Sequence, residues 1–556
     1  MRFRTLLCGL LAASLAYARQ PVRERHAMVV AQEPLAADVG VAVLEAGGNA
    51  MDAAVAVGFA LAVTHPFAGN LGGGGFLLAR FADGRTTFID FREKAPLAAT
   101  HNMYLDANGE VTKDSQLGWR ASGVPGSVRG FELAHRKYGH KAWAELLEPA
   151  IRLAWEGFPV SYALAQSLHS DSTVRKLAQF PESKRIFLSV DYGGKLVQPD
   201  LARTLKRIQD RGAGDFYQGE TAQKLAAAMH AHGGLITLED LKQYQAVERT
   251  PLRGHYRGYE IITAPPPSSG GTGILQMLGM LEGSGYEKTG AGSAASIHYV
   301  AEVMRRFYAD RSQYFGDPDF YKVPITKLLD PAYIASRRRS IDPQHATPSD
   351  KIGPGKLAGR EGSETTHFNI VDAEGNAVAV TYTLNGGYGS GVTVPGLGFL
   401  LNNEMDDFSA KPGTENMYHL IQGEANAIQP GKRPLSAMTP TILLRDGKLF
   451  MALGAPGGAR IINGVLQVIL NVVDFHMNVQ DAVDWPRFHH QWMPDLLYLE
   501  KGISPDTAAI LRAMGHRVAS FEATDPVVAR VEAILSEDGW LEGATDGRGN
   551  GKAEGY

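Results

Sequence analysis

An alanine-rich segment at residues 47–66, GGNAMDAAVAVGFALAVTHP, begins with two glycines and ends with a proline. Its apolar run between these breakers is typical of a buried helix. Four glycines at 72–75 come next, and FLLARFADGRTTFIDFRE then alternates around Asp83-Gly84. That alternation predicts a strand, a tight turn and a return strand. The N-terminal part of the chain therefore combines a buried helix with a β-hairpin.

Helical stretches and hairpins continue to alternate along the chain. Residues 138–231 are mostly helical in pattern, and residues 264–274, with three prolines and a run of small residues, predict a rigid loop that leads into an apolar helix. The sequence has no internal repeat of fixed period. This pattern predicts a layered α/β (α+β) protein.

A change of composition near residue 365 divides the chain. Residues 336–364 are rich in proline, glycine and charge and have almost no apolar periodicity, which is typical of a linker or exposed loop. Directly after them, TTHFNIVDAEGNAVAVTYTLN alternates around Glu374-Gly375-Asn376 and predicts a hairpin of two half-buried strands. A strand is thus expected to start abruptly at Thr365.

Bulk composition narrows the class of protein. The 556 residues are 44% hydrophobic and 21% charged, which suits a globular protein with a large core. Lysine and arginine number 55 against 59 aspartate and glutamate, a net charge of -4. Because no basic surplus is available to neutralise phosphates, nucleic acid and anionic lipid are poor candidates for partners.

The first residues indicate export. Arg2 and Arg4 precede an apolar run that ends in Ala-Tyr-Ala, which predicts a signal peptide over residues 1–18. The alternative is a membrane anchor, but the run is shorter than the roughly 20 residues that span a bilayer. Cys8, the only cysteine, lies inside this segment, so the mature chain would have neither disulfides nor thiolate metal sites. We expect a secreted protein, in a compartment such as the periplasm.

Common catalytic signatures are absent from the sequence. It contains no G-x-S-x-G, G-x-G-x-x-G or G-x-x-x-x-G-K-[ST] pattern, so serine-hydrolase elbows and nucleotide-binding loops lack support. His489-His490 could suggest a metal site, but adjacent residues on a strand point to opposite faces and no H-E-x-x-H accompanies them. A structural role is the better interpretation of this pair.

Several blocks of sequence resemble the γ-glutamyltransferase (γ-glutamyltranspeptidase) family of N-terminal nucleophile hydrolases. In chain order they are GGNAMDAAVAVGFALAVTHPFAGNLGGGGF, IDFREKAP, RASGVPGSVRGFELAHRKYG, PPPSSGG, FGDPDF, TTHFNIVDAEGNAVAVTYTLNGGYGSG, LLNNEMDDFSAKPG, GKRPLSAMTPTI, GAPGGARI and a closing AEGY. They run from about residue 24 to the end. The resemblance implies a four-layer αββα sandwich in which a large chain, 19–364, and a small chain, 365–556, form one catalytic domain.

By the same resemblance, the precursor cleaves itself between Glu364 and Thr365, and Thr365 becomes the nucleophile. A threonine hydroxyl needs a base, and a chain-terminal threonine supplies one in its α-amino group, whose pKa is about 7.7 to 8.0. The junction of an exposed linker with a strand is also where a backbone cut is sterically possible. Without the resemblance, Thr365 would be interpreted as an ordinary β-branched strand residue.

The resemblance implies further catalytic roles. Thr383 would hydrogen-bond the nucleophile from the neighbouring strand, and the backbone N–H groups of Gly457 and Gly458 would form the oxyanion hole. Glycine suits a backbone that must approach a tetrahedral centre closely, with φ above zero where needed.

Five residues match the family's site for the zwitterionic γ-glutamyl group. Arg92 and Ser436 correspond to its carboxylate clamp, and Asn385, Glu404 and Asp407 correspond to its ammonium cradle. From the residues alone, Arg92 would be a charge on a surface strand, and the acidic residues would belong to a solvated loop.

Two further features concern the same site. The family usually has two serines where this chain has Ser436-Ala437, so one carboxylate donor is missing. The length between Asp407 and Ser436 equals that of family members with a lid loop, which makes residues 412–423, with Tyr418, a candidate lid. The alternative is an ordinary surface loop.

The implied reaction is attack by Thr365 on the γ-amide of glutathione or a similar compound, with the γ-glutamyl ester then passed to water, an amino acid or a peptide. The two chains would form a heterodimer, and no metal or organic cofactor is needed. A cephalosporin-type acylase shares the architecture, but its substrate lacks an α-ammonium, so Glu404 and Asp407 would face no cation. An inactive γ-glutamyl-binding homologue is opposed by the presence of Thr365, Thr383 and both glycines.

Overall fold

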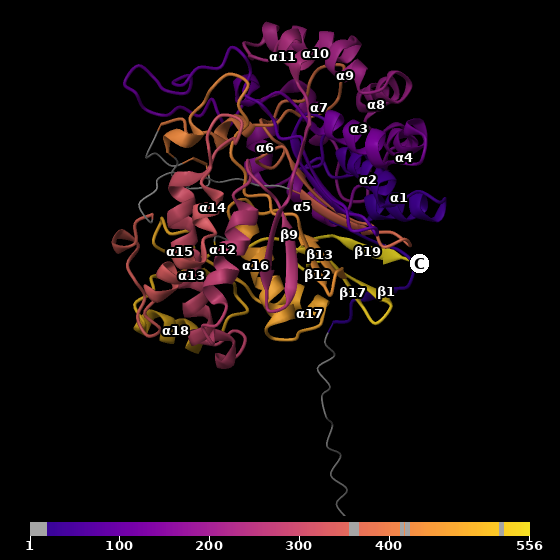
Figure 1. Ribbon diagram of the computed structural model, residues 1–556. Helices are drawn as coiled ribbons and strands as arrows, with labels where there is room; N and C mark the ends of the chain where they lie inside the picture. The colour runs from indigo at the N-terminus through magenta and orange to yellow at the C-terminus, as the bar shows by residue number, and fades with distance from the viewer. Residues whose placement is uncertain (1–18, 355–365, 412–415, 418–422, 522–527) are drawn as a thin grey trace, which may run out of the picture.

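A computed structural model describes residues 19–354, 366–411, 416–417, 423–521 and 528–556. Two antiparallel sheets dominate this part of the chain (Figure 1). Sheet 1 has the strand order β1-β18-β17-β13-β12-β9-β8, and sheet 2 has the order β19-β2-β10-β11-β3-β4-β7. Neighbours in both sheets therefore come from distant parts of the sequence.

The strands of sheet 1 are β1 Val22–Glu24, β8 Leu252–Tyr256, β9 Tyr259–Thr263, β12 Thr441–Arg445, β13 Lys448–Gly454, β17 Glu532–Glu537 and β18 Trp540–Ala544. Those of sheet 2 are β2 Met28–Ala31, β3 Gly74–Arg80, β4 Thr86–Asp90, β7 Val247–Arg249, β10 Thr366–Val371, β11 Ala377–Thr383 and β19 Lys552–Gly555. Two small sheets contain β5 Phe158–Pro159 with β6 Lys195–Leu196, and β14 Phe488–His489 with β15 Leu497–Leu499 and β16 Val518–Ser520.

Helices cover the outer face of each sheet (Figure 1). The sheet 2 side carries helices from the first half of the chain: α1 Pro34–Glu45, α2 Ala50–Thr64, α3 Ser127–Tyr138, α4 Trp143–Glu156, α5 Tyr162–Leu168, α6 Asp171–Leu177, α7 Pro181–Phe187, α8 Pro199–Arg211, α9 Gly214–Gln218, α10 Glu220–Ala231 and α11 Leu238–Gln243. The other side carries α12 Gly270–Leu281, α13 Ala294–Tyr314, α14 Ile325–Leu328, α15 Pro331–Arg339, α16 Arg460–Val473, α17 Val479–Asp484 and α18 Pro505–Ala513.

Side-chain alternation in sheet 2 separates two cores. Val29 of β2 and Phe368 of β10 pack with α2 in the core on the helix side, whereas Met28 and Val30 pack in the core that sheet 1 shares. Because successive strand residues face opposite sides, one sheet can line both cores. The result is the expected four-layer αββα sandwich, so the predicted fold class is confirmed.

The N-terminal elements agree with the sequence pattern. Every residue of α2 is buried, and Asn49 and Asp52 form a reciprocal capping box at its start. The predicted hairpin is β3 and β4, which pair antiparallel, and Gly84 in the turn between them has a φ of 90°. The predicted buried helix and its following hairpin are both confirmed.

Two expectations were wrong in part. The strands β10 and β11 are buried along their whole length rather than half-buried, because α2 covers one face and sheet 1 the other. The expected loop at 336–364 begins inside α15, and Ser349 within it is buried. Glu364 and Thr365 lie outside the described residues, as do the signal segment 1–18 and most of the candidate lid.

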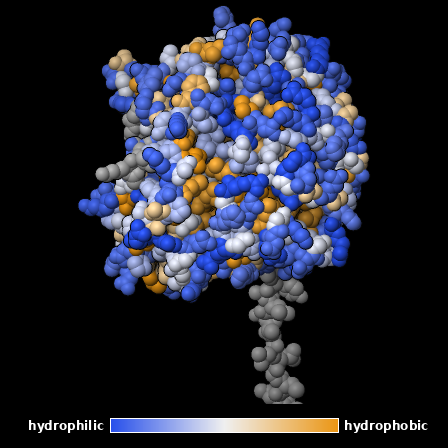
Figure 2. Space-filling view, viewed as in Figure 1, coloured by the Kyte–Doolittle hydropathy of each residue, from blue (hydrophilic) through white to orange (hydrophobic). Residues whose placement is uncertain are grey.

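Hydrophilic side chains make up most of the face seen in Figure 2, with hydrophobic ones in small groups between them. Across the described ranges, no helix combines the length and the apolar character needed to cross a bilayer.

Candidate active site

Arg92 lies just beyond the end of β4, and none of its side chain is exposed. Its Nε donates to the carbonyl oxygen of Pro434 at 3.3 Å, and its Nη2 donates to that of Leu435 at 2.9 Å. The same guanidinium forms ion pairs with Glu404 through Nη1 and with Asp407 through Nη2. Arg92 is therefore a buried charge at the centre of a cluster and not the surface charge that its local sequence favoured.

Glu404 and Asp407 belong to a short 3₁₀ turn, Glu404–Asp407, and both are fully buried. Burial raises the pKa of Glu404, and the charge of Arg92 opposes this shift. Burial and the nearby Glu404 together raise the pKa of Asp407 well above its ordinary value. The solvated-loop interpretation of these carboxyl groups was wrong.

Glu93 adds a third buried carboxyl group, with Oε2 3.7 Å from Nη1 of Arg92. Burial, reinforced by the charge of Glu404, raises its pKa well above its ordinary value. Sequence reasoning missed Glu93, because neighbours on a strand point to opposite faces. β4 ends at Asp90, however, so Arg92 and Glu93 lie beyond the strand and reach the same cluster.

Thr383 is the last residue of β11, and its main chain is held by Asn70. The Nδ2 of Asn70 donates to the carbonyl oxygen of Thr383 at 2.8 Å, and its Oδ1 accepts from the N–H of Gly73 at 2.9 Å. Asn70 therefore ties the glycine run to the end of β11. Asn70 stands two residues before those glycines, and its local sequence gave no signal of this contact.

Asn385 connects Thr383 to the acidic turn. Its N–H donates to Oγ1 of Thr383 at 2.7 Å, and its Nδ2 donates to the carbonyl oxygen of Asn403 at 2.9 Å. Its φ of 72° is unusual for a residue other than glycine. These contacts place Asn385 between Thr383 and Glu404, which directly follows Asn403.

Ser436 follows the two carbonyl groups that Arg92 holds. Its N–H donates to the carbonyl oxygen of Pro267 at 2.8 Å, and its Oγ accepts from the N–H of Met438 at 3.2 Å. Ala437 is fully buried beside it. The residues expected to form the carboxylate clamp are therefore adjacent in space.

Gly457 and Gly458 lie between β13 and α16, with φ angles of 135° and 63°. A Cβ on Gly457 would lie 3.0 Å from Cα of Ala529, so this backbone passes close to its neighbour. The φ angles of both positions therefore favour glycine, and at Gly457 the close approach of Ala529 adds to this preference.

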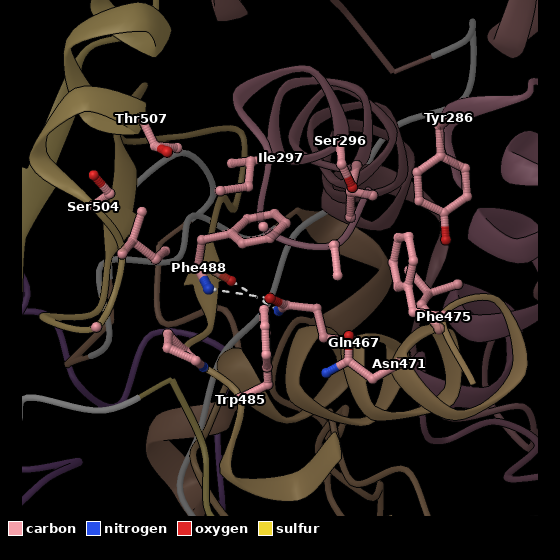
Figure 3. A pocket seen from close by; sticks show the side chains of 17 residues that line it. Tyr286, Ser296, Ile297, Gln467, Asn471, Phe475, Trp485, Phe488, Ser504 and Thr507 are labelled. Atoms are coloured by element: carbon pink, nitrogen blue, oxygen red, sulfur yellow. Dashed lines mark hydrogen bonds between the residues drawn. The ribbon is translucent and has the colours of Figure 1, made fainter. Parts of the chain in front are cut away.

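A cavity of about 230 Å³ lies elsewhere, between α13 and α16 (Figure 3). Its walls include Ser296, Gln467, Trp485 and Phe488, and none of the expected site residues that the structure describes lines it. The side chain of Gln467 is already hydrogen-bonded within the protein, because its Nε2 donates to the carbonyl oxygen of Phe488 at 2.9 Å (Figure 3).

His489 and His490 are both buried near this cavity. His489 hydrogen-bonds with Asn463 and Gln491, and His490 contacts Asp495 at 3.3 Å. Burial lowers the pKa of His489 to about 3 and that of His490 to about 4.

Comparisons with known proteins, by sequence and by structure, each match most of the chain. A family model described as Gamma-glutamyltranspeptidase matches residues 36–556. The glutathione hydrolase proenzyme of Escherichia coli (strain K12) is 50% identical over 533 residues, which are 95% of this chain and 91% of that protein. The glutathione hydrolase proenzyme of Pseudomonas sp. (strain A14) is 49% identical, with both chains covered completely. The crystal structure of cephalosporin acylase from Bacillus halodurans superposes with a TM-score of 0.86 at 28% identity, covering 99% of each chain.

Proposed function

This chain belongs to the gamma-glutamyltranspeptidase family, and we propose that it is a γ-glutamyltransferase and glutathione hydrolase. The observation that carries the proposal is the buried cluster of Arg92, Glu404 and Asp407. A γ-glutamyl group bears its α-carboxylate and α-ammonium on one carbon, so its receptor must offer opposite charges side by side. Substrate binding would exchange the internal ion pairs for equivalent pairs with the ligand, which limits the cost of desolvating either partner.

The active form in this proposal is a heterodimer. Cleavage between Glu364 and Thr365 would give a large chain, 19–364, and a small chain, 365–556, after removal of a signal peptide at 1–18. The names of the relatives support processing, since both are proenzymes. Export to the periplasm is part of the same proposal.

The chemistry begins with the new N-terminus. The hydroxyl oxygen of Thr365 attacks the γ-carbonyl carbon while its proton passes to the free α-amino group. The N–H groups of Gly457 and Gly458 stabilise the negative oxygen of the tetrahedral intermediate. Thr383 hydrogen-bonds the nucleophile. When the intermediate collapses, the C–N bond breaks and the leaving amine takes the proton, so a γ-glutamyl ester remains on the enzyme.

The ester is then resolved by a second attack of the same kind. Water gives glutamate, whereas the amine of an amino acid or dipeptide gives a new γ-glutamyl amide. During both steps Arg92 and Ser436 hold the substrate carboxylate, and Asn385, Glu404 and Asp407 hold its ammonium. The charged α-carbon thus stays fixed while the γ-carbon reacts.

Incubation with glutathione tests the proposed function. Purified protein should release glutamate and cysteinylglycine, and added glycylglycine should divert part of the glutamate into γ-glutamylglycylglycine. Thr365→Ala is the matched control and should form neither product. Failure of the processed wild type to consume glutathione would contradict the proposal.

A cephalosporin-type acylase is the second candidate, because a structure of that kind superposes over nearly the whole chain. The two functions differ in their need for an α-ammonium on the acyl group. Loss of a hydrogen bond to a charged partner costs about 1.5 to 3 kcal/mol. A glutaryl anilide should therefore react roughly 10-fold to 100-fold more slowly in kcat/KM than the γ-glutamyl anilide. Equal rates would favour the acylase.

A further inference from the structure

The loop before α12 runs beside the segment that contains Ser436. Ser268 and Ser436 form a parallel bridge, and the N–H of Ser269 donates to the carbonyl oxygen of Ser436 at 2.8 Å. Oγ of Ser268 donates to the same oxygen at 3.3 Å and to that of Met438 at 2.7 Å. The position of Ser436 is therefore set largely by a loop from a distant part of the sequence.

Arg311 extends this contact into the core. It lies on α13 and is 1% exposed, and its Nε donates to Oγ of Ser269 at 2.8 Å. That hydroxyl in turn donates to the carbonyl oxygen of Ser436 at 3.0 Å. A hydroxyl that accepts from a guanidinium is polarised and becomes a better donor, so the two hydrogen bonds strengthen each other.

Arg311 also belongs to the electrostatic surroundings of the charge cluster. Burial lowers its pKa to about 9, while interactions with Tyr308 and Asp407 oppose this shift. Its guanidinium carbon lies 5.8 Å from the ring centre of Tyr308. Burying a guanidinium is expensive and contributes little to stability on balance, so the position is better explained by the geometry that it enforces.

We propose that Arg311 is a positioning residue for the α-carboxylate of the substrate, acting through Ser269 on Ser436. This inference rests on the proposed function and names a residue outside the expected site. Ser436 Oγ already accepts from the N–H of Met438, so its own proton can donate to a carboxylate. Arg92 fixes the carbonyl of Leu435 on one side, and the Arg311–Ser269 pair fixes the carbonyl of Ser436 on the other.

The test compares two donors that differ only in the α-carboxylate. One is γ-glutamyl 4-nitroanilide, and the other is 4-aminobutanoyl 4-nitroanilide, which retains the amine. Arg311→Met and Ser269→Ala should each raise KM for the glutamyl donor about 5-fold to 20-fold with little change in kcat, because the contact is already present in the ground state. Neither variant should alter kcat/KM for the aminobutanoyl donor. The double variant should match the more severe single variant, since both residues act in one relay.

Arg306→Met is the matched control, because Arg306 is another buried arginine of α13 that pairs with Glu302. Arg306→Met should lower Tm but leave the ratio of kcat/KM for the two donors unchanged. Arg311→Lys, which keeps the charge, should restore part of the ratio. If Arg311→Met does not fold, the comparison of the two donors with Ser269→Ala tests the inference.

A Ser269→Ala enzyme with the Tm of the wild type would overturn the inference if it leaves the donor ratio unchanged or slows both donors equally. A wild type that is processed but does not cleave γ-glutamyl anilide would overturn the proposed function, and this inference with it.

Discussion

Arg92 can hold two carbonyl oxygens and two carboxylates at once because a guanidinium presents several N–H donors in a fixed plane. A lysine at this position would carry the same charge, but its ammonium group could not present donors in this planar arrangement. The same planar group would bind the two oxygens of a substrate carboxylate. This side chain therefore links the internal order of the site to its proposed specificity.

Arg92→Ala should impair both binding and stability. It leaves Glu404 and Asp407 buried without their counter-ion, and removing one partner of a buried ion pair costs about 3 to 5 kcal/mol. We expect a donor KM raised by at least roughly 10-fold, from the loss of a charged hydrogen bond, and a lower free energy of unfolding in urea.

The loss of stability in this variant should be smaller at pH 5 than at pH 8, because protonation neutralises the stranded carboxylates. Arg92→Lys should recover part of the stability and little of the KM. A variant with unchanged KM would show that the carboxylate binds elsewhere.

Ala437→Ser would restore the second serine that family members usually have. Ala437 is fully buried next to Ser436, and its carbonyl oxygen accepts from Oγ1 of Thr439 at 2.7 Å. An added hydroxyl that reaches the carboxylate should lower the donor KM by a few-fold, up to about 10-fold, with a smaller effect on kcat. Initial rates across donor concentrations would measure this. An unchanged KM would mean that another group already fills the position.

At the scale of elements, the ends of strands form the site. Thr383 ends β11, the glycine pair follows β13, and Arg92 follows β4. The interiors of these strands are packed on both faces, and the residues of the site lie where the ladder stops. Asn70 stabilises one of these strand ends, because its side-chain Nδ2 donates to the carbonyl oxygen of Thr383.

The strand β17 carries a buried carboxyl group outside the site, Glu532, whose pKa is raised well above its ordinary value by burial and then by Asp546. A carboxyl with a raised folded-state pKa stabilises the fold below its unfolded pKa, and this stability is lost as the pH rises through the folded value. Glu532→Gln removes the titration. Thermal melts from pH 4 to pH 9 should therefore show the variant losing less Tm than the wild type at the alkaline end.

Glu537→Gln, at the exposed end of the same strand, is the control for that experiment. Its melting curve should follow the wild type across the same pH range. Parallel curves for Glu532→Gln and the wild type would contradict the role assigned to Glu532.

For the whole molecule, the order of strands determines how the two proposed chains are held together. In sheet 2, β10 and β11 lie between β2 and β3, so strands that follow residue 365 are paired on both sides with strands that precede it. Sheet 1 is mixed in the same way, with β9 next to β12. Within the described residues, neither of the two large sheets is built from one proposed chain alone.

Cleavage should therefore leave the native particle intact. Denaturing electrophoresis should show two bands, with the smaller one beginning Thr-Thr-His-Phe, while size exclusion should give the same volume as for uncut Thr365→Ala. Separation should need concentrations of denaturant that unfold the sheets. An active enzyme that remains a single chain would contradict the mechanism, and chains that separate under native conditions would contradict the packing argument.

The sequence by itself determined the local elements and the family. Breakers around an apolar run defined α2, alternation defined the β3–β4 and β10–β11 hairpins, and ordered motifs identified the relatives. These signals are local, because periodicity and turn chemistry depend on neighbouring residues. The roles of Thr365, the lid candidate and the signal segment remain predictions.

Only the tertiary structure decided which charges are buried together. Without the family resemblance, Arg92 and the acidic turn each looked like solvated segments, and Arg311 gave no signal at all within its helix. Their environment depends on loops that meet from distant parts of the chain, and burial changes both the strength of a charge interaction and the pKa values involved. The sequence shows which residues are charged, but it does not show which of them packing removes from solvent.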